Sequence, residues 1–382
     1  MLKRETLASN PCKSSYQRHA GHLNVKLKGT NALPLQRRKP RGMPCGCTPP
    51  APSAAMSGQN LAQEQEHMLD AKRLGAELAE AGLFQQAAKA FKIYLERCVD
   101  QEAPVLEMYA QVLQELESYD AAREAAGKAV QLQPDWPDAH ATYARCCLNC
   151  GAVKEALQAF NTARLLMPAD PSIASEAEEA ADLYSRQLSL LVGLPLRLLS
   201  HAPGSVGTAR GPGSVVWDSG VLLAWYLKQY LGRPELAGAP VLELGSGTGL
   251  VGLAAALCGA QATLTDTHEV VPSLAANVAA NAEEIQKAGG AATAAVFDWD
   301  SAIGTPAFGE AADLSHGWIL GADLVYSHQQ VEPLVAALSA LRAAHGPSVR
   351  MLLAHKHRSD AVDAALMTSL QAAGFHAHEI PP

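Results

Sequence analysis

From residue 61 to residue 169, small and large apolar residues recur together with a period of about 34 to 35 residues. Alanine returns wherever two helices would have to approach closely, and an aromatic or larger apolar residue fills the space beside it. Proline follows two of the copies, where it would stop a helix because it has no amide hydrogen to donate. This pattern predicts a stack of helix pairs.

Three copies of the pattern can be aligned. They contain Gly82, Phe84, Ala87 and Phe91; Tyr119, Ala122, Ala126, Ala129 and Pro134; and Gly151, Ala156, Phe160, Ala163 and Pro168. With these spacings the region resembles the tetratricopeptide-repeat family over about 110 residues. Three repeats are about the minimum that buries a continuous core by stacking, and a helix predicted at 172–191 would cover the last face. A generic alanine-rich helical bundle is the alternative.

After residue 216 the pattern changes to short apolar segments that alternate with helical ones. Strands are predicted near 240–244, 262–265, 294–297, 318–320, 349–354 and 376–380. This alternation is typical of a parallel, doubly wound sheet with helices on both faces. We therefore predict an α + α/β protein with four parts. These are a disordered segment at 1–57, a repeat domain at 58–191, a linker or entry loop at 192–216 that is rich in Gly, Pro and Ser, and a second domain at 217–382.

Composition supports two globular domains. Hydrophobic residues make up 48% of the 382 residues and charged residues 18%, which excludes collagen-like, coiled-coil and wholly disordered chains. The eight cysteines show no disulfide framework, so we predict a reduced, cytoplasmic protein. Cys147 and Cys150 lie in a predicted helix without a second pair of zinc ligands, so they are interpreted as core residues and no metal site is predicted.

Charge is distributed unevenly along the chain. Residues 1–56 contain ten Lys or Arg residues and one acid, Glu5, for a net charge of +9, so the overall charge of −8 leaves −17 on the rest. An acidic body repels phosphate backbones and attracts basic proteins or peptides. We therefore predict a protein partner and no nucleic-acid partner.

The basic N-terminal segment has too few apolar residues to pack on a domain. It is compatible with a plastid or mitochondrial transit segment, and Met56 is an alternative start of the protein. The longest apolar stretch, at 250–264, is interrupted by two glycines and a glutamine and falls short of the ~20 residues of a membrane span. No membrane partner is predicted.

The strongest chemical signal is the segment Val241 to Leu250, which reads VLELGSGTGL. It is a buried strand followed by a glycine-rich turn that opens a helix, and such turns let the backbone approach a ligand at the end of the first strand. Its Gly-x-Gly-x-Gly spacing differs from that of dinucleotide enzymes, and no phosphate-loop lysine follows. Asp266, at the end of the next strand, is placed to accept hydrogen bonds from two ribose hydroxyls. These features indicate a nucleoside cofactor without a pyrophosphate.

Further segments resemble the seven-β-strand methyltransferases of family 16, which include many protein-lysine methyltransferases. The matching segments, besides the glycine loop and Asp266, are Val216–Gly220, Asn277 with Asn281, Asp298–Trp299 and Asp323–Tyr326. The resemblance covers about 170 residues and implies a mostly parallel, Rossmann-like sheet and S-adenosylmethionine as the cofactor. The family's seventh strand, inserted antiparallel, is not evident before Pro382.

The resemblance also implies roles for individual residues. Glu243 and the glycine loop would hold the methionine end of the cofactor, Asp298 and Trp299 the adenine, and Trp217 would close over the methionine. The predicted cofactor-binding residues are thus Trp217, Glu243, Gly245, Ser246, Gly247, Gly249, Asp266, Asp298 and Trp299. Either tryptophan could instead be a core residue.

The Asp-x-x-Tyr segment supplies the predicted catalytic residues. Asp323 would hold the acceptor amine and assist the loss of its proton, and Tyr326 would line the methyl-transfer channel. The segment His-Lys-His-Arg at 355–358 has no carboxylate or third histidine at metal spacing, so it is interpreted as a solvated loop.

The predicted function is methylation of a lysine on a partner protein that the repeats dock. Two alternatives remain open. The enzyme could methylate a small-molecule amine, with the repeats serving assembly, or the chain could be a repeat adaptor with a vestigial methyltransferase domain.

Overall fold

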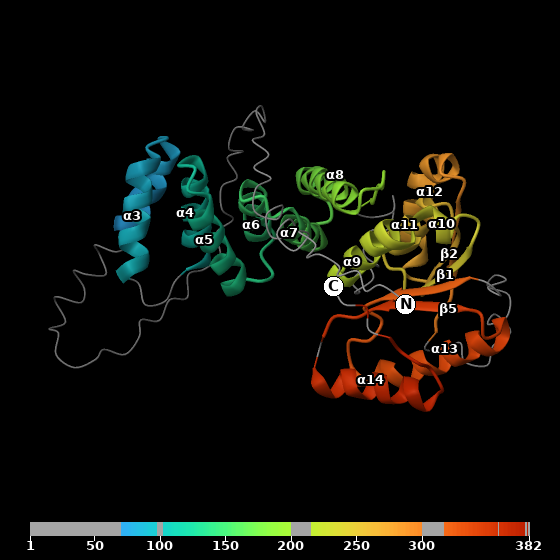
Figure 1. Cartoon of the computed structure of the whole chain (residues 1–382). Coiled ribbons are helices and arrows are strands. Elements are labelled where there is room, and N and C mark those ends of the chain that lie inside the picture. Colours follow the sequence, from blue (N-terminus) through green and yellow to red (C-terminus); the bar gives the residue numbers. More distant parts are fainter. Residues whose placement is uncertain are drawn as a thin grey trace, which may run out of the picture. The chain divides into compact units, whose positions relative to one another are not determined.

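In the computed structural model the described residues are 70–97, 102–199, 215–299, 317–357, 359–378 and 380. The predicted disordered segment at 1–57 lies outside them. The chain divides into two compact units, Met1–Leu166 and Met167–Pro382 (Figure 1).

The first unit is an array of antiparallel helix pairs. After helical residues 70–80, its helices are α3 (Phe84–Arg97), α4 (Ala103–Glu115), α5 (Tyr119–Leu132), α6 (Pro137–Asn149) and α7 (Val153–Leu166). Helix α4 packs on α5 and α6 packs on α7, while α4 also contacts α6, the equivalent helix of the next pair. This arrangement confirms the helical repeat array that the sequence predicted.

The small and large positions of the pattern form the core of this unit. Ala122, Ala126 and Ala129 of α5 are fully buried, as are Phe91 and Phe160 in α3 and α7. A side chain could not replace the hydrogen of Gly75, because its Cβ would lie 2.7 Å from the ring of Phe91. Small residues therefore set how closely neighbouring helices approach.

The turns between paired helices adopt a left-handed backbone. Gly82 and Gly151 have φ angles of 73° and 75°, and the same turn in the middle pair is made by Glu117, with a φ of 55°. A left-handed residue other than glycine costs roughly 1 kcal/mol. The middle turn therefore keeps the geometry of its neighbours without their glycine.

The second unit is built on a parallel five-stranded sheet with the order β3-β2-β1-β4-β5. The strands are β1 (Pro240–Leu244), β2 (Gln261–Asp266), β3 (Ala291–Val296), β4 (Trp318–Ala322) and β5 (Arg350–Ala354). The first, second, fourth and fifth predicted strands are confirmed within two residues at each end, whereas β3 begins three residues earlier than predicted.

The strand predicted at 376–380 does not form among the described residues 376–378 and 380. The end of the preceding helix, α14 (Asp360–Ala372), is tied to α13 (Val331–His345) instead. The Arg342 guanidinium donates to the carbonyls of Ala373 (2.8 Å) and Gly374 (2.9 Å) and lies 4.1 Å from the centre of the Phe375 ring. These contacts fasten the chain to the helical layer before it reaches a sheet edge.

Helices cover both faces of the sheet (Figure 1). Helices α13 and α14 pack on one face through a core that includes Leu242, Ile319 and Leu338. On the other face lie α9 (Asp218–Tyr226), α11 (Leu250–Leu257) and α12 (Val271–Lys287), with the short helices η2 (Leu227–Leu231) and α10 (Gly232–Leu236) between α9 and β1. Among the described residues, no helix combines the length and the apolar character that crossing a membrane requires.

The helix predicted to cap the repeats falls in the second unit instead. This helix is α8 (Pro171–Val192), and it packs against α9. Asp170 caps its N-terminus, because the Asp170 carboxylate accepts from the Ser172 N–H. The helix predicted at 172–191 as a cap of the repeats thus groups with the second unit and contacts α9.

The residues after α8 are also part of the second unit and not a free linker. Asn281 Oδ1 accepts from the Arg197 N–H (2.8 Å) and its amide donates to the Arg197 carbonyl. Asn277 Oδ1 accepts from the Leu199 N–H (2.7 Å). Both asparagines are 2% exposed, so they satisfy the backbone of 197–199 inside the protein. Within the predicted linker or entry loop at 192–216, these residues are thus bonded to α12, while 200–214 lie outside the described part.

Candidate active site

Four acidic residues stand at or beyond the carboxyl ends of neighbouring strands. Glu243 lies in β1, Asp266 ends β2, Asp298 follows β3 and Asp323 follows β4. Strand β1 lies between β2 and β4. The chain adds β2 and β3 on one side of β1 and then adds β4 and β5 on its other side. In parallel sheets such a reversal of strand order leaves a crevice in which ligands bind.

The glycine loop after β1 requires its glycines. Gly245, Gly247 and Gly249 have φ angles of 58°, 53° and 85°, in the left-handed region. A Cβ on Gly245 would lie 2.7 Å from Leu324, and one on Gly249 would lie 2.7 Å from Leu274. The loop therefore packs tightly against the protein on one side with backbone alone.

The loop is fastened to the end of β2 through Thr265, which is fully buried. The Ser246 N–H donates to the Thr265 carbonyl (2.9 Å), and the Thr265 N–H donates to Ser246 Oγ (3.0 Å). The Thr265 hydroxyl donates to the Glu243 carbonyl (2.6 Å). Sequence analysis missed Thr265, although a threonine just before the acid that ends a buried strand is a usable signal.

Glu243 is buried beneath the loop and is only 2% exposed. Its Oε2 accepts from the Gly252 N–H (2.9 Å) in α11, and a Cβ on Gly252 would approach that oxygen to 2.6 Å. Burial raises the pKa of Glu243 to about 8, against the lowering effect of hydrogen bonds from Ser246 and Gly252, and the charge of Asp266 raises it further. Gly252 is thus a second residue that sequence analysis missed.

Asp266 joins β2 to the glycine loop. Its Oδ2 accepts from the Gly247 N–H (2.7 Å) and its Oδ1 from the Thr267 N–H (2.8 Å). Burial raises the pKa of Asp266, these backbone hydrogen bonds lower it, and the nearby charge of Asp298 raises it. The structure therefore brings Glu243, Asp266, Asp298 and the glycine loop close together.

The two tryptophans lie at different places on this edge. Trp299 packs partly buried against the core, with its Nε1 3.9 Å from the position of a Cβ on Gly245. Trp217 is 40% exposed and immediately precedes α9. A Cβ on Gly220 would lie 3.8 Å from Val251 and 3.9 Å from Ala322, so the first turn of α9 sits beside the start of α11 and the end of β4.

The Asp-x-x-Tyr turn after β4 separates buried from exposed residues. Leu324 and Val325 enter the core, while the side chain of Tyr326 is 58% exposed. Asp323 has a left-handed φ of 52°, and its N–H donates to the Ala354 carbonyl at the end of β5 (2.9 Å). Left-handed residues other than glycine are uncommon and often mark functional sites.

The loop after β5 bonds to a carboxylate of α14 that was not predicted from the sequence. Asp363 of α14 bonds to His355 Nε2 (2.9 Å) and to His357 Nδ1 (2.6 Å). The side chain of His357 is 66% exposed but that of His355 only 22%, so the solvated-loop interpretation does not hold for His355. The pairing was missed because the carboxylate lies eight and six residues later, on a separate helix.

The arrangement fits a nucleoside that carries an amino-acid group. The loop packs against Leu324 and Leu274 through backbone alone, and carboxylates converge on it from the ends of β1, β2 and β3. Carboxylates accept hydrogen bonds from hydroxyls and from ammonium groups, which are the polar groups of such a ligand. No lysine or arginine has been found among these loop contacts to hold a phosphate, in the part of the chain that the structure describes.

Comparison with known proteins gives two families. Residues 205–373 match the family described as lysine methyltransferase, and residues 113–177 match the tetratricopeptide repeat. The protein N-lysine methyltransferase METTL21A of Danio rerio is 37% identical over 135 residues, which cover 34% of this chain and 56% of that protein. EEF1A lysine methyltransferase 3 of Xenopus tropicalis is 29% identical over 168 residues, covering 44% and 66% respectively.

A solved structure of the second tetratricopeptide-repeat domain of human RPAP3, in complex with an HSP70 peptide, matches 30% of this chain and 96% of that domain, with 19% identity and a TM-score of 0.29. The chain spans less than two thirds of the length of the two methyltransferases that it matches. The comparisons therefore show similarity for two parts of the chain: residues 205–373 match the lysine methyltransferase family, and residues 113–177 match the tetratricopeptide repeat.

Proposed function

We propose that this protein is a protein-lysine N-methyltransferase that uses S-adenosylmethionine and recruits its substrate through the repeat unit. The observation that carries the proposal is the left-handed Asp323, held at the end of β4 directly beside the glycine loop that Leu324 packs against. The family match to lysine methyltransferases and the similarity to METTL21A support the acceptor class.

The cofactor would be held by the carboxylates that surround the glycine loop. Glu243 would face the ammonium group of the methionine portion, Asp266 the ribose hydroxyls, and Asp298 with Trp299 the adenine. When bound, the sulfonium supplies an activated methyl group. The residues of this chain then need to exclude water and orient the acceptor, since orientation alone contributes several kcal/mol to such transfers.

A lysine amine is protonated at neutral pH, so the site has to favour its deprotonated form before it can accept a methyl group. Asp323 would hold the amine by a hydrogen bond and assist the departure of its proton. The exposed ring of Tyr326, three residues on, would contact the amine and its methyl groups through its face. Both residues belong to one short turn, so the two contacts would be made together.

The repeat unit would supply the docking surface. The first helices of two successive repeats, α4 and α6, carry an exposed polar contact, in which the Asn149 amide donates to Gln114 Oε1 (3.0 Å). Exposed polar side chains on stacked helices offer hydrogen-bonding groups to an extended segment of a partner. The acidic charge of the chain after residue 56 favours a basic partner.

The proposal is tested by incubating the purified protein with S-adenosylmethionine labelled in its methyl group and with cell lysate, followed by mapping of the labelled residues. We expect label on lysine. Asp323→Asn keeps the size and reach of the side chain but removes its charge, so turnover should fall by about 100-fold while cofactor affinity stays the same. Tyr326→Phe should be milder than Tyr326→Ala, because phenylalanine keeps the aromatic wall.

The matched control is Glu332→Gln, which removes an exposed carboxylate from the start of α13 nearby. Its turnover should equal that of the wild type. Label found only on arginine or on small molecules would refute the lysine assignment. A normal rate in Asp323→Asn would refute the role of the Asp-x-x-Tyr turn, and an absence of any cofactor binding would favour a repeat adaptor.

A further inference from the structure

The loop after β5 links two parts of the candidate active site that are distant in sequence. The Lys356 N–H donates to Asp323 Oδ1 (3.0 Å), in the turn after β4. The Lys356 ammonium lies 3.1 Å from Asp218 Oδ2, the residue that follows Trp217 at the start of α9. Lys356 therefore touches both the predicted acceptor turn and the segment predicted to close over the cofactor.

Lys356 does not fix the loop by itself. Its side chain is 55% exposed and that of Asp218 is 64% exposed, and ion pairs at such a surface contribute at most about 1 kcal/mol. The neighbours of Lys356 in the chain make the stronger contacts. His355 and His357, on either side of it, both bond to the carboxylate of Asp363. We name His355, His357 and Asp363 together the histidine clamp.

Asp363 is well placed to hold a loop still. It lies in the first turn of α14, a helix that Leu366 and Leu370 anchor in the core. Hydrogen bonds from His355 first, and then from His357, lower the pKa of Asp363, so the carboxylate is charged and accepts from both imidazoles. Hydrogen bonds to a charged acceptor are about twice as strong as those between neutral groups.

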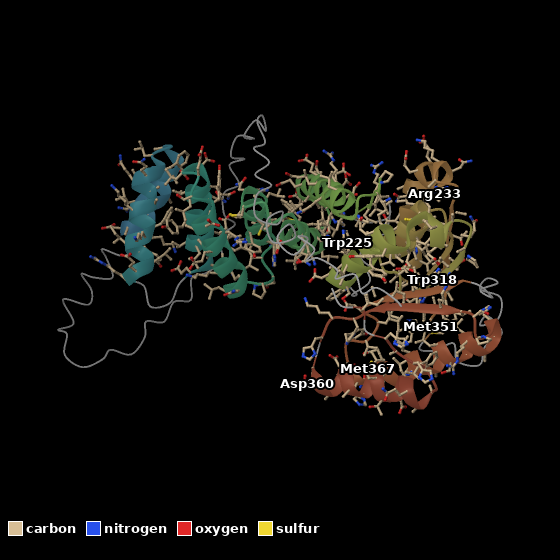
Figure 2. The ribbon with its side chains drawn as sticks, viewed as in Figure 1. Trp225, Arg233, Trp318, Met351, Asp360 and Met367 are labelled. Carbon is tan, nitrogen blue, oxygen red and sulfur yellow. The ribbon has the colours of Figure 1, made fainter. Side chains whose placement is uncertain are left out.

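The other charged groups near the two imidazoles are few in the described residues. Asp360 Oδ1 lies 3.8 Å from His357 Nε2, beyond hydrogen-bonding distance, and its side chain is fully exposed at the beginning of α14 (Figure 2). Lys356 lies between the histidines, and its own contacts are with Asp218 of α9 and Asp323 of the turn after β4. Asp360 and Asp363 thus share a helix turn and a charge but differ in their contacts.

We propose that Asp363 is a positioning residue for methyl transfer, which acts through His355 and His357 to hold Lys356 against Asp323. This inference rests on the proposed function, because it assigns Asp323 to the acceptor amine. Without the clamp the loop would move, Asp323 would lose the hydrogen bond from the Lys356 N–H, and its carboxylate would no longer be fixed toward the acceptor. A displacement of about 1 Å at a reacting group can cost up to roughly 100-fold in rate.

The test uses the full chain with Asp363→Ala and, as the matched control, Asp360→Ala. Both variants remove one negative charge from the same helix turn. Hydrogen–deuterium exchange of the Lys356 amide should accelerate by about tenfold or more in Asp363→Ala and stay unchanged in Asp360→Ala. Turnover should fall by about tenfold in Asp363→Ala only, with the affinity for S-adenosylhomocysteine and the melting temperature equal in the two variants.

Asp363→Asn adds a rescue by the conservative variant, which a purely structural role would not require. An amide can accept from one imidazole and donate to the other, so asparagine should keep part of the histidine clamp. The turnover of Asp363→Asn should therefore lie between that of the wild type and that of Asp363→Ala, with the Michaelis constant for the protein substrate unchanged in both variants.

Equal turnover in the Asp360 and Asp363 variants, or an unchanged Lys356 amide, would overturn the proposal. So would a turnover of Asp363→Asn no higher than that of Asp363→Ala. These results differ from a failure of the proposed function, in which the wild-type chain would transfer no methyl group to any lysine. The exchange measurement needs no activity and would still decide whether the histidine clamp holds the loop.

Discussion

Each unit of the protein buries a glutamate, and the two glutamates have different surroundings. Glu107 in α4 is 6% exposed and Glu243 in β1 is 2% exposed, and burial raises the pKa of both. Glu107 accepts from the Thr142 hydroxyl (2.6 Å) and from the side-chain amide of Gln111. Glu243 accepts from the backbone of Gly252 and from Ser246 of the glycine loop.

The difference shows two uses of a buried acid. Thr142 is 35 residues after Glu107, so this pair joins the first helices of two successive repeats and acts within the scaffold. Glu243 lies beneath a loop of left-handed glycines and close enough to Asp266 for their charges to interact. A buried carboxylate beside other acids is poorly stabilised until a cation arrives, and this is common at binding sites.

The largest expected effect comes from a glycine of the active site compared with a glycine of the repeats. Gly249 and Gly151 are both left-handed, with φ angles of 85° and 75°, so alanine costs each about 1 kcal/mol in backbone strain. Only at Gly249 would the new Cβ also clash, at 2.7 Å from Leu274 and 3.0 Å from Leu264, whereas the space around Gly151 is open.

Gly249→Ala should therefore weaken binding of S-adenosylhomocysteine by at least about tenfold, or about 1.4 kcal/mol, as measured by titration calorimetry. Gly151→Ala should leave that affinity unchanged and lower only the stability of the repeat unit. Equal affinities in the two variants would mean that the glycine loop does not contact the cofactor.

A smaller effect is expected from separating the two units. A chain that begins at Met167, where the contact boundary lies, keeps α8 and the whole sheet domain. Its Michaelis constant for the protein substrate should rise by more than its turnover falls, roughly tenfold, because remote docking contributes similarly to the ground state and the transition state. Steady-state kinetics after a check of folding by circular dichroism decides this. An equal rise in the Michaelis constant of a full-length chain with mutated repeats would support docking by the repeats. An unchanged Michaelis constant in the chain that begins at Met167 would contradict it.

The stability of the folded chain, as distinct from its binding and turnover, should show a pH dependence that distinguishes the two glutamates. Folded Glu243 keeps its proton up to about pH 8, while the unfolded chain releases it near pH 4.5, so the free energy of unfolding should decrease as the pH rises between these values. At about 1.4 kcal/mol per pKa unit the full decrease is on the order of 5 kcal/mol, and Glu243→Gln, which cannot ionise, should remove it. Glu107→Gln should remove a decrease of the same sign from the repeat unit.

The cofactor sharpens this difference. S-adenosylhomocysteine carries an ammonium group that would stabilise the charged form of Glu243, so saturating ligand should weaken the pH dependence that Glu243 causes and leave that of Glu107 unchanged. Denaturant unfolding from pH 5 to pH 8, with and without the ligand, measures both. A ligand effect on the Glu107 dependence alone would contradict the assignment of Glu243.

How far the sequence predicts the structure depends on the range of the contacts involved. The repeat helices and the first five strands follow from local apolar patterns, and the glycine loop follows from a turn whose backbone only glycine adopts easily. The histidine clamp and the contacts of Asn277 and Asn281 do not. The asparagines bind backbone 78 and 84 residues away, and no local pattern marks which segment they meet.

The strand predicted at 376–380 shows the converse limit. A short apolar and polar alternation near the end of the chain suits a strand, yet strands form only beside a partner. In the described residues, Arg342 and the Phe375 ring hold this segment against α13 instead. Local preference was outweighed by one side chain of another helix, Arg342, which bonds to the backbone of this segment and contacts the Phe375 ring.

The hydrogen bonds between α12 and residues 197–199 bear on how such a two-part protein can arise. The family match begins at residue 205, but the backbone that Asn277 and Asn281 satisfy lies before it. A recombination event that joined repeats to the domain at residue 205 would leave two buried amides without these partners, at about 1–3 kcal/mol each. Gene fusions that succeed would therefore be expected to include residues 197–199 together with the catalytic domain. The inherited module is then longer than the segment that matches the family.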